Sequence, residues 1–179
     1  MRVISGSARG TKLETLEGDD TRPTIDRVKE GICSAVQFIL PQASILDLFA
    51  GSGQMGIEAL SRGAKNAVFV DDNRAAVDII IENLKKVKLF PQSKVLNMSA
   101  EQYLTASSDK FDIVFMDPPY NNNTVNKILP NLFTRLNENA VVFCETELTA
   151  ELPQSLGNLE KQKTYKYGKV LVTKYIFKS

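Results

Sequence analysis

Short apolar segments alternate with longer amphipathic segments through the middle of the chain. The apolar segments are rich in Ile, Val, Leu and Phe, and they predict β-strands over 44–49, 66–71, 93–98, 111–117 and 140–145. The segments between them predict helices over 54–63, 73–88, 100–106 and 124–137. Strands joined by helices form parallel sheets, and strands that are apolar almost throughout are buried on both faces. The alternation therefore predicts an α/β fold with a mostly parallel sheet.

Both ends of the chain depart from this alternation. The stretches LEKQKTYKYG and KVLVTKYIF meet at Gly168, which predicts an antiparallel hairpin at one edge of the sheet. At the other end, RVISGS and TKLET predict a small β-hairpin with its turn at residues 8–10. The stretch TRPTIDRVKEGICSAVQFIL then predicts a helix that begins near Thr24. We expect one domain over 1–179, with an N-terminal extension at 1–23 and a core at 24–179.

Composition excludes several classes of site. The chain contains no histidine, and Cys33 and Cys144 lie in unrelated contexts, so we expect no metal site and no Ser-His-Asp triad. The net charge of +1 gives no overall attraction to a nucleic acid or a membrane. The first residues are polar and no apolar run is long enough to cross a bilayer, so we expect a cytoplasmic protein without a signal peptide.

The stretch DLFAGSGQMG follows the first predicted strand and opens a helix. Gly51, Gly53 and Gly56 match G-x-G-x-x-G, and Asp71 ends the next strand, where an acid reaches the ribose of a bound nucleotide. Asp47 adds a carboxylate beside the same loop. A carboxylate repels a pyrophosphate but attracts a ligand with an ammonium and a sulfonium group. The loop therefore favours S-adenosylmethionine, with NAD and a plain glycine-rich turn as the alternatives.

The stretch FMDPPY ends another predicted strand, at the edge where parallel sheets bind their ligands. Pro118 and Pro119 stiffen the turn and offer no N–H groups, which leaves the Asp117 carboxylate and the Pro118 carbonyl as acceptors. Acceptors without competing donors suit an amino group, and the Tyr120 ring suits a stacked base. We interpret the stretch as a site for the exocyclic amino group of a base that has left its stack. A rigid turn is the alternative.

Together these stretches resemble the bacterial 16S ribosomal RNA guanine-N2 methyltransferases of the RsmD type. The resemblance rests on MRVISGSARGTKL, DTRPTIDRVKEGICSAV, ILDLFAGSGQMGIEALSRGAKNAVFVD, FDIVFMDPPY and YGKVLV, in this order. It implies a Rossmann-like, seven-stranded sheet with an N-terminal hairpin and helix. It also implies S-adenosylmethionine as cofactor and the N2 amino group of a guanine in 16S rRNA as target. The expected substrate is an assembling 30S subunit, and the expected enzyme is a monomer.

The resemblance also assigns roles to individual residues. It implies a catalytic loop of Asp117, Pro118, Pro119 and Tyr120. It implies cofactor contacts at Asp47, Phe49, Ala50, Gly51, Ser52, Gly53, Asp71, Asp72, Ser99 and Ala100. It implies RNA contacts at Arg9, Arg22, Thr24 and Arg27. The family commonly has Glu where Asp71 stands and an Asp near Ser99. We expect the shorter Asp71 still to reach a ribose, and Ser99 to substitute weakly for that Asp at the adenine amino group.

Other functions remain as alternatives. A DNA adenine methyltransferase usually carries a target-recognition region, for which this chain has no spare length. A protein amide methyltransferase usually has Asn where Asp117 stands. An inactive RNA-binding assembly factor would not need the intact loops. The last 22 residues, from Asn158 to Ser179, hold lysines interleaved with tyrosines and a single acid, Glu160. This pattern fits either an edge that follows RNA phosphates or a charged strand edge that resists aggregation.

Overall fold

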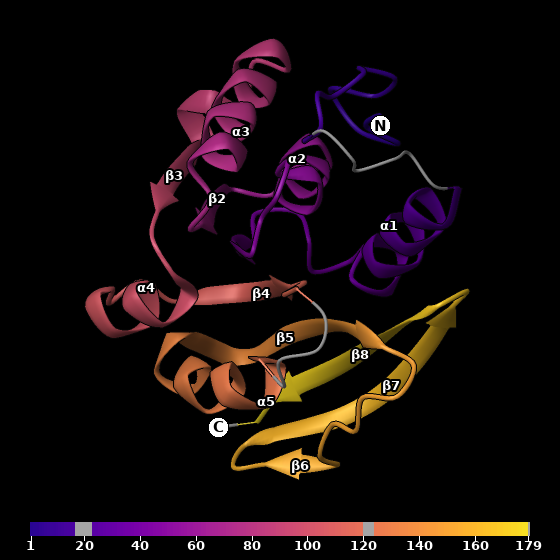
Figure 1. Cartoon of the computed structure of the whole chain (residues 1–179), viewed down its shortest axis with the longest axis vertical. Coiled ribbons are helices and arrows are strands. Elements are labelled where there is room, and N and C mark those ends of the chain that lie inside the picture. Colours follow the sequence, from indigo (N-terminus) through magenta and orange to yellow (C-terminus); the bar gives the residue numbers. More distant parts are fainter. Residues whose placement is uncertain (17–22, 120–123, 179) are drawn as a thin grey trace.

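One mixed sheet runs through the computed structural model, which describes residues 1–16, 23–119 and 124–178, with the backbone only for 23–25. Within these ranges the sheet has eight strands in the order β3-β2-β1-β4-β5-β8-β7-β6 (Figure 1). The strands are β1 Ser44–Leu48, β2 Asn66–Asp71, β3 Ser93–Asn97, β4 Phe111–Met116, β5 Leu136–Glu147, β6 Ser155–Leu156, β7 Leu159–Tyr167 and β8 Val170–Phe177. Strands β1 to β5 are parallel, while β8 and β7 form the antiparallel hairpin. The predicted α/β fold is confirmed, and the short β6 is added to the seven expected strands.

Helices cover both faces of the sheet. They are α1 Pro23–Ala35, α2 Gln54–Ser61, α3 Arg74–Lys86, α4 Ala100–Ala106 and α5 Thr124–Ile128, with 3₁₀ turns at Phe90–Gln92 and Leu129–Arg135. Successive strand residues face opposite sides, so Ile45 joins the core under α1, α2 and α3, and Leu46 joins the core under α4 and α5. This two-sided burial is why the central strands are apolar almost throughout. None of the described helices is both long enough and apolar enough to cross a membrane.

The predicted helix over 124–137 was wrong beyond its first turns. Helix α5 ends at Ile128, because Pro130 has no N–H group to continue the α-helical hydrogen bonds. A 3₁₀ segment follows, and β5 then begins at Leu136, which pairs with Phe111 on β4. The helical spacing of apolar residues in the sequence gives no sign of this pairing between distant residues.

The N-terminal segment is less regular than the predicted hairpin. Its antiparallel pairing is limited to one bridge, between Arg2 and Lys12. The segment is instead fixed to the helices beneath it. Glu58 on α2 is 1% exposed, and its carboxylate accepts hydrogen bonds from the backbone N–H of Ile4 at 2.8 Å and of Ser5 at 3.0 Å. Residues 1–16 are therefore held against α2 by specific polar contacts.

Candidate cofactor and catalytic site

The two predicted motifs meet at the carboxyl edge of the sheet, where the strand order reverses. Leu48, the last residue of β1, pairs with Val70 on β2 and with Met116 on β4. The residues that follow, Asp71 and Asp117, therefore lie level with the start of the glycine loop and on either side of it. Neighbouring strands are about 4.8 Å apart, so roughly 10 Å separates these two acids. This edge is where open α/β sheets bind their ligands.

Two carboxylates fix the backbone of the glycine loop. Asp71 accepts hydrogen bonds from the N–H of Gly51 at 2.8 Å, through Oδ2, and from the N–H of Asn73 at 2.9 Å, through Oδ1. Asp47 is buried, and its Oδ2 accepts a hydrogen bond from the N–H of Gly56 at 2.8 Å. The predicted acids thus lie at the loop, and each one positions a glycine of the motif.

Burial changes the acidity of Asp47. Desolvation raises the pKa of its carboxyl to about 7, the Gly56 N–H acts in the opposite direction, and the nearby negative charge of Asp71 raises the pKa further. A cation beside Asp47 would favour the charged carboxylate. This charge arrangement fits a ligand that carries an ammonium or sulfonium group and not a pyrophosphate.

Two glycines of the motif, Gly51 and Gly56, are glycine for different reasons. Gly51 has φ +55°, and a Cβ built on it would meet nothing within 4 Å, so the loop leaves open space on that side. A Cβ on Gly56 would lie 2.3 Å from the Phe69 ring, so this glycine allows α2 to approach β2. Phe49 also has a positive φ, of 61°, which is strained for a side chain of this size. The turn is therefore shaped around a space beside Gly51 that a ligand can enter.

One further polar group lies near the end of this loop. The side-chain oxygen of Gln54, at the start of α2, is buried and has no hydrogen-bond partner in the described part of the chain. An unpaired buried acceptor fits a ligand that brings donor groups. The residues present therefore fit S-adenosylmethionine, whose ammonium group and ribose hydroxyls are donors.

The residues predicted to hold the adenine end of the cofactor lie after β2 and at the start of α4. Asn97 donates from Nδ2 to the backbone oxygens of Asp71 at 3.1 Å and of Asp72 at 3.0 Å, which holds the turn after β2. Asp72 itself is exposed. Ser99 is the N-cap of α4, and its Oγ accepts from the N–H of Gln102 at 3.2 Å. A second lone pair of Ser99 Oγ stays available to an adenine amino group. Because Ala100 is buried, only its backbone can meet a cofactor.

The Asp-Pro-Pro turn follows β4, and one of its two prolines is buried while the other is exposed. Asp117 and Pro119 are exposed, whereas Pro118 is buried. The buried ring anchors the turn, and the exposed carboxylate of Asp117 lies at the carboxyl edge. Tyr120, the predicted stacking ring, lies outside the described residues.

Two of the four predicted RNA contacts, Arg9 and Arg27, have described side chains, and they lie on different elements. Ala8 and Ser7 are bound to Ser61, at the far end of α2, so Arg9 lies toward the amino edge of the sheet and away from Asp117. Arg27 is exposed on the first turns of α1. Arg22 lies outside the described residues, and only the backbone of Thr24 is described.

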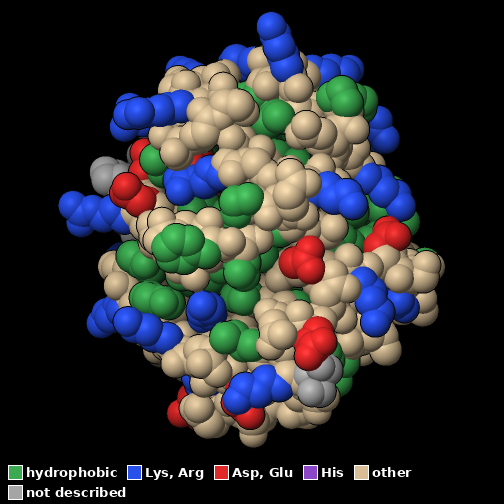
Figure 2. Space-filling model, turned by 180° about the vertical axis from the view of Figure 1, so that it is seen from behind, with side chains coloured by type: hydrophobic (Ala, Val, Ile, Leu, Met, Phe, Trp, Pro, Cys, Tyr) green, Lys and Arg blue, Asp and Glu red, His purple; other side chains and the backbone are tan. Residues whose placement is uncertain are grey.

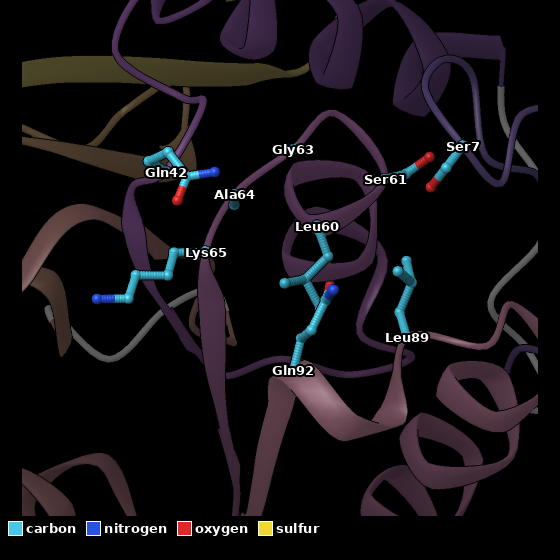
Figure 3. Close-up of a pocket in the computed structure, with 9 residues that line it drawn as sticks. All are labelled: Ser7, Gln42, Leu60, Ser61, Gly63, Ala64, Lys65, Leu89 and Gln92. Carbon is cyan, nitrogen blue, oxygen red and sulfur yellow. The ribbon is translucent and has the colours of Figure 1, made fainter.

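A cavity of about 440 Å³ lies at the opposite edge of the sheet from Asp117. Gln42, Lys65 and Gln92 line it, and these residues precede β1, β2 and β3. Figure 3 shows that the Lys65 side chain points away from Leu60, so the polar groups around this cavity do not converge. The cavity is therefore separate from the glycine loop.

Asn83 is a polar residue at the site that the motifs did not reveal. It lies on α3, is 0% exposed, and its Nδ2 donates to the backbone oxygen of Ser52 at 3.0 Å. Its neighbours on the buried face, Ile80 and Leu84, are apolar. A polar residue within that apolar stripe was the available signal, because buried amides require partners.

Comparisons with known proteins agree with this geometry. The sequence matches the family described as Conserved hypothetical protein 95 over residues 1–176. It is 37% identical over 171 residues to ribosomal RNA small subunit methyltransferase D of Haemophilus influenzae, with 92% of this chain and 88% of that protein covered. The Escherichia coli (strain K12) protein of the same name is 33% identical over 179 residues, with 98% and 89% covered.

Solved structures give the same result. The Escherichia coli methyltransferase yhhF is similar with a TM-score of 0.88 and 31% identity, covering 100% of this chain and 98% of that chain. A methyltransferase in complex with S-adenosylhomocysteine shares the fold, with a TM-score of 0.68, 13% identity, and coverage of 87% of this chain and 50% of that one. These findings confirm the resemblance seen in the sequence: the chain belongs to the family described as Conserved hypothetical protein 95, the RsmD family of methyltransferases.

Proposed function

We propose that this methyltransferase transfers a methyl group from S-adenosylmethionine to the exocyclic N2 amino group of one guanine in small-subunit ribosomal RNA. The observation that carries the proposal is the strand register at the carboxyl edge. It aligns Asp117 with the start of the glycine loop and with Asp71 across neighbouring strands. A cofactor held at Gly51 and an amino group held at Asp117 would thus meet at the point where the strand order reverses.

The relatives support the substrate class. Proteins named ribosomal RNA small subunit methyltransferase D align with this chain over almost its whole length. Methyltransferase relatives imply S-adenosylmethionine as the methyl donor, and this argues against the NAD-dependent alternative. The guanine N2 position comes from the sequence resemblance alone, because the acceptors of the Asp-Pro-Pro turn fit any exocyclic amino group.

The chain's own residues would position the acceptor amine. The Asp117 carboxylate and the Pro118 carbonyl would accept its two N–H groups, which withdraws the nitrogen lone pair from the base ring and aims it at the methyl group. Asp117 would then take the proton that the nitrogen loses. When bound, S-adenosylmethionine supplies the methyl group from its sulfonium and is released as S-adenosylhomocysteine.

The remaining assignments follow from this function. We infer that residues 1–23 form the extension that contacts RNA and that 24–179 form the catalytic core. The substrate is an assembling 30S subunit, which places the enzyme in the cytoplasm. One chain supplies all the residues named for the site, consistent with a monomer.

The direct test is transfer of a labelled methyl group to small ribosomal subunits from cells that lack this gene, followed by nucleoside analysis. We expect N2-methylguanosine at one position. N6-methyladenosine, or transfer to a protein amide, would instead assign one of the alternative acceptors. Asp117→Ala is the matched variant: transfer should be lost while the affinity for S-adenosylhomocysteine stays within about twofold, because Asp117 holds the acceptor. Loss of both together would mean that the turn only supports the fold.

A further inference from the structure

The β7–β8 hairpin reaches the same edge of the sheet as Asp117. Val170 begins β8 and pairs with Glu147 on β5 and with Tyr167 on β7. Cys144 on β5 is level with the last residue of β4. The hairpin turn therefore extends two residues, about 7 Å, beyond the level of Asp117, and it lies three strands, about 14 Å, to one side.

Helix α1 passes beside this turn at Gly31, in the second half of the helix. A Cβ built on Gly31 would lie 2.0 Å from the hydroxyl oxygen of Tyr167, so the helix backbone lies directly against that ring. Farther along the helix, the backbone oxygen of Ala35 accepts a hydrogen bond from Lys174 Nζ at 3.4 Å, and Lys174 is four residues from Val170 and level with Phe115 on β4. The helix thus runs away from the hairpin turn. Its first turns, which carry the exposed Arg27, lie on the same side as that turn (Figure 1).

The lysines of this hairpin are in different situations. Glu160, the acid of this segment, pairs with Lys178. Lys163 lies over the Tyr165 ring, with Nζ 5.0 Å from its centre. Lys166 and Lys169 are exposed, and neither forms an ion pair within the described residues. Two uncompensated positive charges therefore project at the hairpin turn.

Lys166 lies on the outer edge of β7, which β6 covers only at Leu159 and Glu160, so protection of a strand edge accounts for Lys166 but not for Lys169. Charges resist aggregation where a long row of unpaired backbone groups is exposed. Lys169 lies in the turn itself, and Lys166 is one residue from the end of β7. Figure 2 shows positive and negative side chains interspersed over the rear face of the molecule, so a broad field of one sign is absent from that view. If Lys166 and Lys169 attract a polyanion, the attraction therefore comes from where these two side chains lie and not from a broad positive surface.

We propose that Lys166 and Lys169, together with Arg27, form a phosphate-binding rim beside the catalytic turn. The rim holds the backbone of the RNA substrate while the target base reaches Asp117. This inference rests on the proposed function and adds the surface that receives the RNA. Lysines that contact phosphates contribute affinity without sequence preference, and that affinity falls steeply with salt.

The test compares two double variants that each remove two exposed positive charges. Lys166→Ala/Lys169→Ala changes the rim, and Lys65→Ala/Lys110→Ala changes residues that precede β2 and β4 at the opposite edge. For the rim variant we expect the KM for small subunits to rise roughly tenfold, while kcat at saturation and the affinity for S-adenosylhomocysteine stay within about twofold. The plot of log affinity for 16S rRNA against log salt should become less steep by about 1.5, as expected for two lost phosphate contacts. The control should match wild type.

Each other outcome has a distinct meaning. Equal KM and salt dependence in the two variants would overturn the rim while leaving the proposed function intact. Retained binding to naked 16S rRNA with lost binding to small subunits would also overturn it, because the hairpin would then contact a ribosomal protein. Wild-type protein that methylates no RNA would refute the proposed function itself.

Discussion

Asn83 Nδ2 donates a hydrogen bond to the backbone oxygen of Ser52 at 3.0 Å, which ties the middle of α3 to the glycine loop. The same side chain accepts from the N–H of Glu14 at 2.8 Å and donates to the Glu14 oxygen at 3.0 Å. One buried amide therefore joins the glycine loop to the N-terminal segment. Every polar atom of the Asn83 side chain has a partner.

Asn83→Ala should destabilise the protein and weaken cofactor binding together. The change leaves the backbone groups of Ser52 and Glu14 without their partner, and each buried group left unpaired costs about 1–3 kcal/mol. We expect the free energy of unfolding to fall by roughly 3 kcal/mol in denaturant titrations. The affinity for S-adenosylhomocysteine should also fall when measured calorimetrically. Lys86→Ala is the control, because it removes only the exposed ion pair between Lys86 Nζ and Glu14, at 2.8 Å. Similar results for both variants would contradict this role.

Two glycines of the motif should respond to alanine in opposite ways. Gly56→Ala would drive a methyl group into the Phe69 ring, and such overpacking typically costs about 1–3 kcal/mol of stability. Gly51→Ala meets no atoms of the protein, so it should cost only about 1 kcal/mol for its positive φ while filling the cofactor space. Thermal unfolding and calorimetric titration with S-adenosylhomocysteine separate the two. A Gly51→Ala variant with wild-type affinity would show that the cofactor does not approach this side of the loop.

Elements whose limits depend on local burial were predicted closely from the sequence. The predicted strand 66–71 coincides with β2, because the apolar run ends where the strand leaves the core. The end of α5 was missed, since it depends on Pro130 and on the pairing of Leu136 with Phe111, which lies far away in the sequence. Strand β5 was likewise predicted too short.

The site was predictable where a motif fixes both residue type and spacing. Asp71 and Gly51 were assigned to one ligand from the sequence, and the structure joins them by a hydrogen bond. Asn83 was missed because its partners, at positions 14 and 52, are distant in the sequence. The place of Arg9 depends on how the N-terminal segment crosses α2, and this could not be predicted because the contacts of that segment with Glu58 and Ser61 join residues that are distant in the sequence.

Glu58 should be essential for holding the N-terminal segment. Its carboxylate, 1% exposed, accepts from Ile4, from Ser5 and from Arg62 Nε at 2.8 Å. Glu58→Ala leaves three donors unpaired, and loss of a buried partner of this kind costs about 3–5 kcal/mol. We expect a lower free energy of unfolding and rapid proteolytic cleavage within residues 1–16.

The control for Glu58 is another i,i+4 pair on a helix. Arg74→Ala breaks the exposed contact between Arg74 Nε and Asp78, at 3.2 Å, which is worth about 0.5 kcal/mol at most. Cleavage of the N-terminal segment at the same rate in wild type and in Glu58→Ala would show that other contacts hold it.

Asp47 should make both stability and cofactor affinity depend on pH. Its pKa in the folded protein, about 7, is above the ordinary aspartate pKa of 3.8. Between these values the folded state binds more protons than the unfolded state, so the contribution of Asp47 to stability falls as pH rises from about 4 to 7. In denaturant titrations without cofactor, we therefore compare the free energy of unfolding of Asp47→Asn with that of wild type. The difference in favour of the variant should be larger at pH 8 than at pH 5.

Cofactor binding should have the opposite pH dependence. A cationic ligand favours the ionised form of Asp47, so the affinity for S-adenosylmethionine should rise by roughly tenfold between pH 6 and 8 if binding lowers this pKa well below 6. Asp47→Asn can still accept the Gly56 N–H but cannot ionise, so its profile should lack this rise. The cofactor's own amino group titrates in both proteins, and the difference between the two profiles isolates Asp47. Parallel calorimetric profiles would place the cation of the cofactor away from Asp47.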